Sequence, residues 1–324
     1  MKRILVTGGA GFIGSSLCQY LLRRGNYVIC LDNFYTGRME NIQDLKNDSN
    51  FELMTYDIRE GIPNIKVDEI YNLACPASPK WYQKDPIFTF ETCILGAMNV
   101  LKLAQKNKAK VMQASTSEVY GDPASSPQSE TYNGNVNPIG IRSCYDEGKR
   151  AAETMFMDYH KMYNIDTRII RIFNTYGPMM DIDDGRVISN FICQALKNEP
   201  ITIYGDGSQT RSFQYYSVLI EKMVDIMELE REIYQDIYLP INIGSPSQEF
   251  NMSKLAYKII ELTNSSSAVK YEDLPEDDPR QRRPDITRLK KYLDYAEFSV
   301  PLEEGLKYTI EYFKNELTKC QKGL

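Results

Sequence analysis

A glycine-rich turn near the N-terminus constrains the fold of this chain more than any other feature of its sequence. The apolar run Ile4–Thr7 predicts a buried strand, and Gly11–Arg24, with its apolar side chains on one face, predicts a helix. Between them the chain reads TGGAGFIG over residues 7–14. The glycines permit a tight turn, and the helix N-terminus offers free N–H groups and its positive dipole end to an anion. Strand, turn and helix together predict a site for the pyrophosphate of a dinucleotide.

Asp32 bears on which dinucleotide binds there. It follows a second apolar run, Tyr27–Leu31, and lies 24 positions after the first glycine of the turn. This is close to the spacing of about 20 residues expected for a carboxylate that accepts a hydrogen bond from a ribose 2′-OH. Such a carboxylate would repel a 2′-phosphate. Asn33 and Phe34 add no charge, and Arg38 is the only nearby cation. The sequence therefore favours NAD over NADP.

Short apolar runs and helical patterns alternate through the first half of the chain. Further strands are predicted at Glu52–Tyr56, Ile70–Ala74, Val111–Ser115 and Thr167–Phe173, with long helices at Ile87–Asn107 and Tyr145–Tyr163. The alternation predicts an α/β fold, a Rossmann-type doubly wound parallel sheet with right-handed crossovers. We assign residues 1–174 to this NAD-binding domain and residues 175–324 to a smaller mixed α/β substrate domain. We expect the chain to return to the first domain around 205–240.

The second half has a weaker pattern. Helices are predicted at Val187–Leu196, Tyr216–Glu230 and Leu302–Lys314, with an extended stretch at Thr202–Tyr204. Ser217 stands where it can cap the second of these helices. The polar tail from Asn315 is expected to fray.

Composition excludes several classes of function. The 324 residues carry 38 Lys and Arg against 44 Asp and Glu, a net charge of −6, whereas a general nucleic-acid binder needs clustered cations. The seven cysteines are scattered, odd in number and without a CxxC pair, which is typical of reduced thiols. A single histidine, His160, cannot build the usual zinc site, and it is the only possible base for a Ser-His-Asp triad. No apolar run approaches the ~18–20 residues of a membrane span, and no signal-peptide core precedes the first strand. We expect a cytoplasmic protein without metal, membrane or nucleic-acid partner.

A second set of residues suggests redox chemistry on an alcohol. Tyr145 and Lys149 stand at i and i+4, which puts both side chains on one helix face. A phenol has a pKa near ~10, and lowering it by about 3 units takes roughly 4 kcal/mol of differential interaction with a nearby ammonium and a positive nicotinamide ring. Thr116, Ser117 and Glu118 follow the strand Val111–Ser115, at the edge where ligands bind in open α/β sheets.

Together these features resemble the extended short-chain dehydrogenase/reductase superfamily over nearly the whole chain. Longer strings narrow the resemblance to the UDP-glucuronic acid decarboxylase (UDP-xylose synthase) family. They are YNLACPASP at 71–79, STSEVYG at 115–121, NVNPIG at 135–140, CYDEGKR at 144–150, RIFNTYGP at 171–178, DGRV at 184–187, YGDGSQTR at 204–211 and RRPDI at 282–286. Related 4,6-dehydratases carry an aspartate where this chain has Ser117, which favours the decarboxylases.

The resemblance implies a reaction and a set of catalytic residues. UDP-glucuronic acid would be oxidised at C4, lose CO2 from the resulting keto acid and be reduced again to UDP-xylose. Tyr145 would take the 4-OH proton, Thr116 would orient that hydroxyl, and Lys149 would hold the nicotinamide ribose and lower the tyrosine pKa. Ser117 and Glu118 would position the ring and handle the C5 proton through water. Arg282 would position the sugar carboxylate without fully pairing it.

The resemblance also implies the binding residues. For NAD these are Gly8, Gly11, Phe12, Ile13, Gly14, Asp32, Asn33, Phe34, Thr36, Gly37, Asp57, Ile58, Leu73, Ala74, Ala77, Thr92, Ser115, Tyr145, Lys149 and Thr175. For the UDP-sugar they are Glu118, Tyr145, Asn174, Arg186, Val187, Tyr204, Gln209, Arg211 and Arg282. Arg186 and Arg211 would contact the pyrophosphate, and Tyr204 would stack on uracil.

Three alternatives stay open at this point. The chain could be a related UDP-sugar 4-epimerase, an enzyme that releases the UDP-4-keto-pentose, or an NAD-binding scaffold without activity, although all four of Thr116, Glu118, Tyr145 and Lys149 are intact. Relatives commonly dimerise through the helices near Ile87–Asn107 and Tyr145–Tyr163, which implies a homodimer. One departure is Cys93, where the family usually has an asparagine beside the cofactor. Another is Val218, near which the family usually has an aspartate.

Overall fold

A parallel sheet forms the centre of the computed structural model, which describes residues 1–275, 277, 279–294 and 299–321. Within these residues its seven strands lie in the order β11-β6-β5-β4-β1-β2-β3, and every neighbouring pair is parallel. The strands are β1 (Arg3–Thr7), β2 (Tyr27–Asp32), β3 (Phe51–Thr55), β4 (Glu69–Asn72), β5 (Lys110–Thr116), β6 (Thr167–Ile172) and β11 (Ile241–Ile243). Because the strand order reverses beside β1, the sheet is doubly wound, and the predicted Rossmann-type fold is confirmed.

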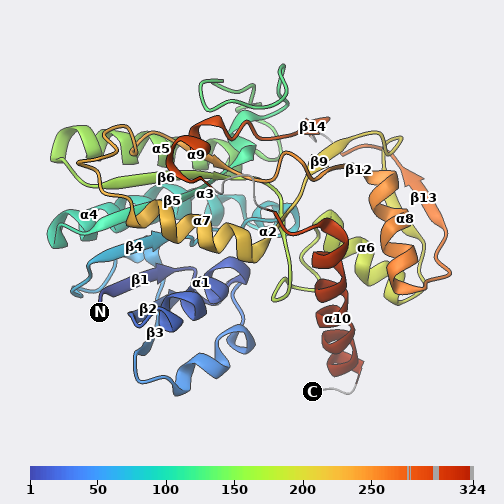
Figure 1. Cartoon of the computed structure of the whole chain (residues 1–324), viewed down its shortest axis with the longest axis horizontal. Coiled ribbons are helices and arrows are strands. Elements are labelled where there is room, and N and C mark those ends of the chain that lie inside the picture. The colour runs from blue at the N-terminus through green and yellow to red at the C-terminus, as the bar shows by residue number, and fades with distance from the viewer. Residues whose placement is uncertain (276, 278, 295–298, 322–324) are drawn as a thin grey trace.

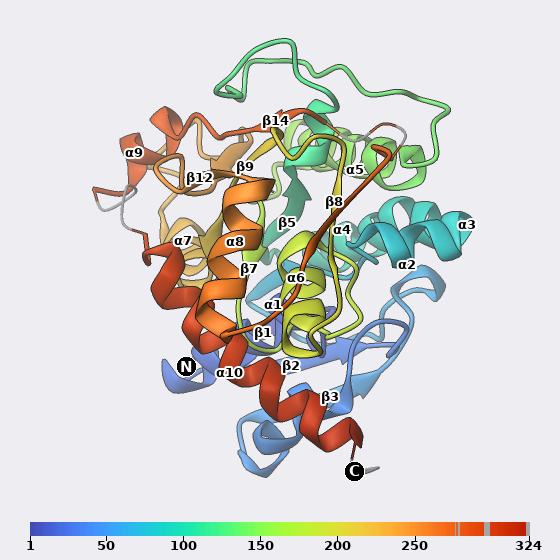
Figure 2. The same cartoon turned by 90° about the vertical axis from the view of Figure 1, so that its right-hand side faces the viewer.

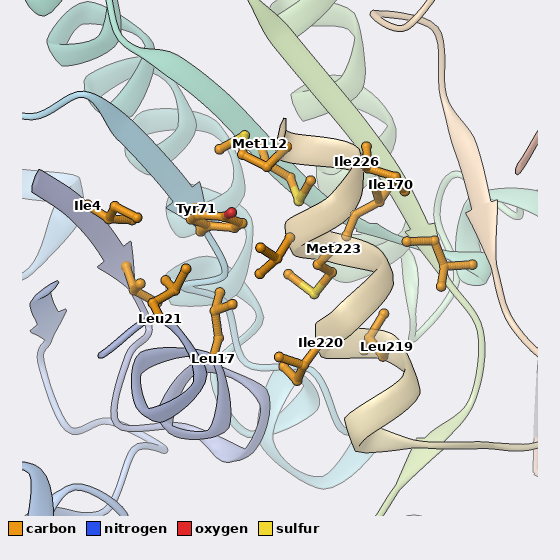
Figure 3. Packing of buried hydrophobic residues seen from close by; sticks show 14 of the residues in the cluster. Ile4, Leu17, Leu21, Tyr71, Met112, Ile170, Leu219, Ile220, Met223 and Ile226 are labelled. Atoms are coloured by element: carbon orange, nitrogen blue, oxygen red, sulfur yellow. The ribbon is translucent and has the colours of Figure 1, made fainter. Parts of the chain in front are cut away.

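Both faces of the sheet are covered, so its strands read as continuous apolar runs. On one face lie α1 (Phe12–Arg23), α7 (Tyr216–Glu228) and α9 (Thr287–Tyr292), and on the other α4 (Ala97–Asn107) and α5 (Ser143–Tyr163) (Figure 1). Neighbouring residues alternate between the two cores, as Ile4 and Leu5 do on β1. Figure 3 shows Leu17 and Leu21 of α1 and Met223 of α7 packed with sheet residues from four strands.

A second core lies beyond the carboxyl ends of the strands. It is built from α6 (Val187–Leu196), α8 (Met252–Thr263) and α10 (Leu302–Gln321), which stand together in Figure 2. Three small sheets accompany them: β12-β9-β14 (Glu249–Asn251, Thr210–Ser212, Gln281–Arg282), β13-β8 (Val269–Glu272, Ile201–Tyr204) and β10-β7 (Gln214–Tyr215, Thr175–Tyr176). The parallel pair β14 and β9 puts Arg282 opposite Arg211. This mixed α/β unit faces the edge of the sheet at which ligands bind in such folds.

The remaining regular elements are short. They are α2 (Pro79–Lys84), α3 (Pro86–Glu91), a π-helical turn Thr92–Gly96, and 3-10 turns at Met39–Asn41, Gln43–Asn47, Ile58–Glu60 and Ser117–Tyr120. The chain returns to the sheet layer through α7, which packs in the same core as α1, and through β11, which extends the sheet beside β6.

Two local predictions were wrong. Residues 315–321 do not fray, because α10 continues to Gln321, and the mostly buried Glu316 side chain lies 3.6 Å from the Arg38 guanidinium; residues 322–324 lie outside the described residues. Ser217 does not cap α7. The N-cap position is Tyr215, one residue before the helix starts, and it makes no side-chain capping bond.

The membrane expectation also needs correction. The prediction that no apolar run approaches the length of a membrane span is wrong for the helical segment Pro86–Asn107. By length and composition this segment could cross a membrane. Half of its most apolar window is buried inside the protein, where α3 and α4 pack against α5. A buried helix of a folded domain meets the same criteria of length and apolar composition, so this segment is only weak evidence that the chain crosses a membrane.

Candidate active site

The glycine turn and the ends of β1, β2 and β4 enclose a first cavity of about 180 Å³. Gly8 has a φ of +68°, and a Cβ there would lie 2.8 Å from the Ala74 nitrogen. A Cβ at Gly14 would lie 2.0 Å from the Gly8 oxygen, so both positions require glycine. α1 starts at Phe12 without a side-chain cap, which leaves its first N–H groups for a ligand. This donor set fits a dinucleotide pyrophosphate.

Most of the predicted cofactor residues line this first cavity. They are Gly8, Gly11, Phe12, Ile13, Gly14, Asp32, Asn33, Thr36, Asp57, Ile58, Leu73, Ala74, Ala77 and Thr92. Phe34 and Gly37 are not in its lining and lie behind the carboxylate of Asp32. The Phe34 N–H donates to Asp32 Oδ1 at 2.8 Å, and a Cβ on Gly37 would lie 2.7 Å from that same oxygen.

Asp32 is buried and held in a fixed orientation. Its Oδ2 accepts a hydrogen bond from the Ala10 N–H at 2.9 Å. Burial raises the pKa of Asp32 above its ordinary value, while backbone hydrogen bonds from Phe34 and Ala10 act against that rise. The carboxylate oxygens retain lone pairs for a ribose hydroxyl.

Sequence reasoning missed the aromatic wall of the first cavity. Tyr35 stacks on Phe88 with ring centroids 4.2 Å apart, and Trp81 meets Tyr35 edge-on at 6.2 Å. Tyr35 and Trp81 are 46 positions apart in the chain. Nothing in their local patterns indicates that α2 and the loop after β2 come together.

A second cavity of about 480 Å³ opens beside the first and shares Ile13, Leu73, Cys75, Ala77 and Arg186 with it. Its lining includes the predicted catalytic and substrate residues Thr116, Ser117, Glu118, Tyr145, Lys149, Asn174, Arg186, Val187, Tyr204, Gln209, Arg211 and Arg282, together with Ser115 and Thr175. The structure therefore brings together residues from the sheet edge, from α5 and from the second core. His160 lies outside both linings and stacks on Tyr238, so it serves no triad here.

Tyr145 and Lys149 share the inner end of the second cavity. The Tyr145 ring stacks on Tyr82 with centroids 5.0 Å apart, and Lys149 Nζ donates to the Ala114 carbonyl at 2.9 Å. Burial raises the pKa of Tyr145 well above its ordinary value, the charge of Cys75 adds to this, and the Thr116 hydroxyl acts in the opposite direction. Lys149 is not among the chief causes of this shift, so the lowering that we expected from Lys149 together with a nicotinamide ring stays a prediction.

Glu118 lies at the centre of a buried ion-pair cluster. Both of its oxygens accept hydrogen bonds from the Arg282 guanidinium, and Oε2 also accepts from Arg142 Nη2 at 2.6 Å. Burial alone would raise the pKa of Glu118, but Arg142 and Arg282 outweigh it, and the net direction is downward. Glu118 is therefore an ionised carboxylate.

Arg142 is a site residue that sequence reasoning missed. It occupies the N-cap position of α5, three residues before Tyr145, and lines the second cavity. The helical spacing of 142, 145 and 149 could have indicated a shared face. Its partner Glu118 is 24 residues away across a long loop, so the pairing itself is invisible in the sequence.

The rest of the second cavity suits an anionic, polar ligand. The described residues of its lining include one carboxylate, Glu118, and five cations (Arg142, Lys149, Arg186, Arg211 and Arg282), of which Arg186 is also paired with Asp184 in the lining of the first cavity. Three lining residues have a buried polar atom without a hydrogen-bond partner among the described residues: Asn174 (Nδ2), Gln209 (Oε1) and Arg282 (Nε). Such atoms are costly when buried unless a ligand or water completes them. No cluster of metal ligands occurs among the described residues.

Comparisons with known proteins agree with this geometry. Residues 5–308 match the family described as GDP-mannose 4,6 dehydratase. UDP-glucuronic acid decarboxylase 4 of Arabidopsis thaliana is 50% identical over 320 residues, which are 99% of this chain and 70% of that protein. UDP-glucuronic acid decarboxylase 1 of Xenopus tropicalis is 49% identical over 98% of this chain and 73% of its own length. The crystal structure of UDP-glucuronic acid 4-epimerase from Bacillus cereus, in complex with UDP-glucuronic acid and NAD, is 30% identical. It covers 97% of this chain and 99% of its own, with a TM-score of 0.84.

Asp146, next to Tyr145 on α5, makes the cluster sensitive to pH. Its carboxyl group is buried, 3.9 Å from the Arg142 guanidinium. Burial, followed by the negative charge of Glu118, raises the pKa of Asp146 to about 8, against the opposing effect of Arg142 and Arg282. The folded protein therefore retains a proton that the unfolded chain has already released above about pH 4.

We predict that Asp146→Asn makes the free energy of unfolding less dependent on pH. In the wild type, stability should fall as pH rises from about 4 to about 8, because the unfolded chain binds fewer protons than the folded one in that window. The neutral amide removes this difference. Chemical denaturation at pH 5.5 and 8.5 tests the prediction, with Glu147→Gln as control for the loss of any carboxylate from α5. Equal pH dependence in wild type and Asp146→Asn would contradict it.

Proposed function

This chain belongs to the UDP-glucuronic acid decarboxylases, within the family described as GDP-mannose 4,6 dehydratase, and we propose that it converts UDP-glucuronic acid to UDP-xylose with NAD as cofactor. The observation that carries the proposal is the cationic cavity in which Tyr145 lies near an ionised Glu118 that is paired with Arg282. This cavity is continuous with a cradle that fits a dinucleotide.

Residues of the first cavity would hold NAD. The N–H groups at the start of α1 suit its pyrophosphate, and Asp32 suits a ribose hydroxyl. When bound, NAD supplies a hydride acceptor for C4 of the sugar and a positive ring charge. Lys149, which lines the second cavity with its Nζ 5.7 Å from the centre of the Tyr145 ring, would hold the nicotinamide ribose.

Tyr145 and Thr116 act at the C4 oxygen of the sugar. Tyr145 takes the proton of the 4-OH, and the Thr116 hydroxyl orients that oxygen. Once C4 is a ketone, the C5 carboxylate lies β to a carbonyl, so loss of CO2 leaves charge that spreads into an enolate. The two hydroxyls then stabilise the enolate oxygen as an oxyanion hole does. Proton return at C5 and reduction at C4 complete the product.

The ion pair with Glu118 explains how an arginine can assist decarboxylation without preventing it. A guanidinium clamped on the sugar carboxylate would stabilise the ground state and oppose CO2 loss. Arg282 already has its charge compensated by both oxygens of Glu118. We infer that Arg282 orients the sugar carboxylate while its own charge stays compensated by Glu118.

We also propose that the chain forms a homodimer through the segment Pro86–Asn107 and α5. Ile87, Phe90 and Leu95 of that segment are large apolar residues that are 68, 42 and 42% exposed. At the end of α5, Met162 and Tyr163 are also exposed. Large apolar side chains exposed on packed helices are typical of an interface, which supports this proposal.

The reaction itself is tested by incubating the protein with UDP-glucuronic acid and NAD and analysing the nucleotide sugars by mass. We expect a product lighter by one CO2, without net NADH. An isomer of unchanged mass would indicate an epimerase, and NADH with a keto product would indicate release of the UDP-4-keto-pentose. No turnover would indicate a scaffold.

Tyr145→Phe should slow CO2 release by a factor of about 10²–10⁴, because it removes the acid–base group but keeps the ring stacked on Tyr82.

Glu118→Gln should separate substrate binding from turnover. Without the carboxylate, Arg282 and Arg142 are free to pair with the sugar carboxylate and stabilise it before CO2 is lost. We expect kcat to fall at least about tenfold, or about 1.4 kcal/mol in the barrier, while the KM for UDP-glucuronic acid stays equal or decreases. Calorimetric titration with UDP-xylose, which lacks the carboxylate, is the control. Unchanged kcat, or equal tightening for both ligands, would refute this role of Glu118.

Leu95→Glu tests the proposed dimer. A charge placed in an apolar interface must be desolvated, so the variant should be a monomer by light scattering after size exclusion. Tyr257→Glu, on the exposed side of α8 in the second core, is the matched control and should remain a dimer. A monomeric wild type, or dimers of both variants, would contradict the proposal.

A further inference from the structure

Two cysteines from different elements meet at the junction of the two cavities. Cys75 follows β4 in an irregular loop, and Cys93 lies in the π-helical turn Thr92–Gly96. Their sulfur atoms are 3.3 Å apart, and both thiols are free. Cys75 lines both cavities, whereas Cys93 is 3% exposed. One thiol can therefore be reached by a small molecule in either cavity, and the other is buried directly behind it.

The two thiols differ in their acidity. Burial alone would raise the pKa of Cys75, but a hydrogen bond from the Cys93 thiol and the charge of Lys149 outweigh it, and the net direction is downward. The pKa of Cys93 moves upward, chiefly because of its hydrogen bond with Cys75 and its burial. The accessible sulfur is thus the better nucleophile and the buried one is its proton donor. Cys75 is half-buried but lines both cavities, and an accessible thiol next to a second thiol is the usual arrangement of a reversible oxidation site.

The surrounding structure allows a bond between the sulfurs. A disulfide requires an S–S distance of about 2.05 Å, so the atoms must approach by about 1.2 Å. Cys93 is backed by α5, where a Cβ on Gly148 would lie only 2.9 Å from the Cys93 Cβ. Cys75 itself lies outside any helix or strand, in an irregular loop that is fixed to β1 just before it by a hydrogen bond from the Leu73 N–H to the Thr7 carbonyl at 3.1 Å. The approach would therefore be made mainly by the loop.

We propose that Cys75 and Cys93 form a reversible oxidation site that responds to peroxide. The Cys75 thiolate attacks one oxygen of hydrogen peroxide, the O–O bond breaks, and with one proton taken up the products are a sulfenic acid and water. The Cys93 sulfur then attacks the Cys75 sulfur, and its proton leaves with the hydroxyl as a second water. Two thiols have lost two electrons to one peroxide, and a dithiol reductant reverses the change.

Oxidation at this place should affect ligand binding and turnover. Leu73, Cys75 and Ala77, all in the loop that would move, line both cavities. Cys75 is also close enough to Tyr145 and Lys149 for their charges to interact. A ligand that fills the first cavity would cover Cys75 and slow its reaction. The effect on turnover rests on the proposed function, whereas formation of the disulfide does not.

Mass spectrometry of the full chain tests the site directly. The protein is treated with hydrogen peroxide, free thiols are alkylated, and the chain is digested with trypsin without reduction. We expect a cross-link between peptides 67–80 and 85–102, which contain Cys75 and Cys93, and its disappearance after dithiothreitol. Prior addition of NAD should slow its formation several-fold. Overoxidation of Cys75 without a cross-link, or no modification of either cysteine, would overturn the proposal.

Two serine variants provide matched controls. Cys93→Ser should abolish the cross-link and leave Cys75 to oxidise further, whereas Cys144→Ser, which removes the next thiol in the same region, should leave the cross-link intact. Each variant's activity is compared with its own reduced state, and thermal unfolding establishes that it is folded.

Peroxide should lower wild-type turnover several-fold, and dithiothreitol should restore it. If the protein has no decarboxylase activity, the peptide masses still decide whether the site exists, so the two proposals fail separately. A cross-link between Cys75 and Cys144 in the wild type would refute the pairing.

Discussion

The buried carboxylate of Glu118 connects the two halves of this molecule. It stands in the 3-10 turn after β5, and its main partner, Arg282, stands on β14 in the second core. A buried ion is stable only when hydrogen bonds replace its water, and here two arginines do so. Removing one partner of such a buried pair typically costs about 3–5 kcal/mol. The same ion pair that holds the second core on the sheet therefore also shapes the cavity between them.

Much of the sheet layer could be predicted from the sequence, for a physical reason. Strands covered on both faces must be apolar throughout, so β1, β2, β5 and β6 stand out as short runs, and the glycine turn identifies where the first crossover begins. The strands that accompany the second core could not be predicted as well from the sequence. These strands have two to four residues, too few for a periodic pattern, and the pairing of β14 with β9 joins residues that are 71 positions apart in the chain. α10 continues beyond Phe313, its last residue in the second core, and there Glu316 pairs with Arg38 from the sheet layer.

The candidate site was predicted unevenly. Tyr145, Lys149, Thr116 and Glu118 could be found because helical spacing and strand ends place them, and the longer strings added Arg282. The division at residue 174 stays a prediction. The core that packs on the sheet also contains residues of α7, β11 and α9, so folding units and sequence ranges do not coincide. Arg142 and the sulfur contact between Cys75 and Cys93 were missed, because each depends on a meeting of distant segments that no local pattern encodes.

The environment of Tyr145 suggests that base strength at this site depends on the bound cofactor. Burial raises the pKa of the phenol and so favours its protonated form in the protein alone, whereas a base must lose that proton once the ligand is bound. Low solvent exposure weakens screening, so a positive ring placed nearby acts on the phenol much more strongly than it would in water. The burial that raises the pKa of Tyr145 thus also increases its response to NAD. Glu118 adds to the rise in the pKa of Tyr145, so the positive ring must outweigh that carboxylate as well as burial before the proton is removed.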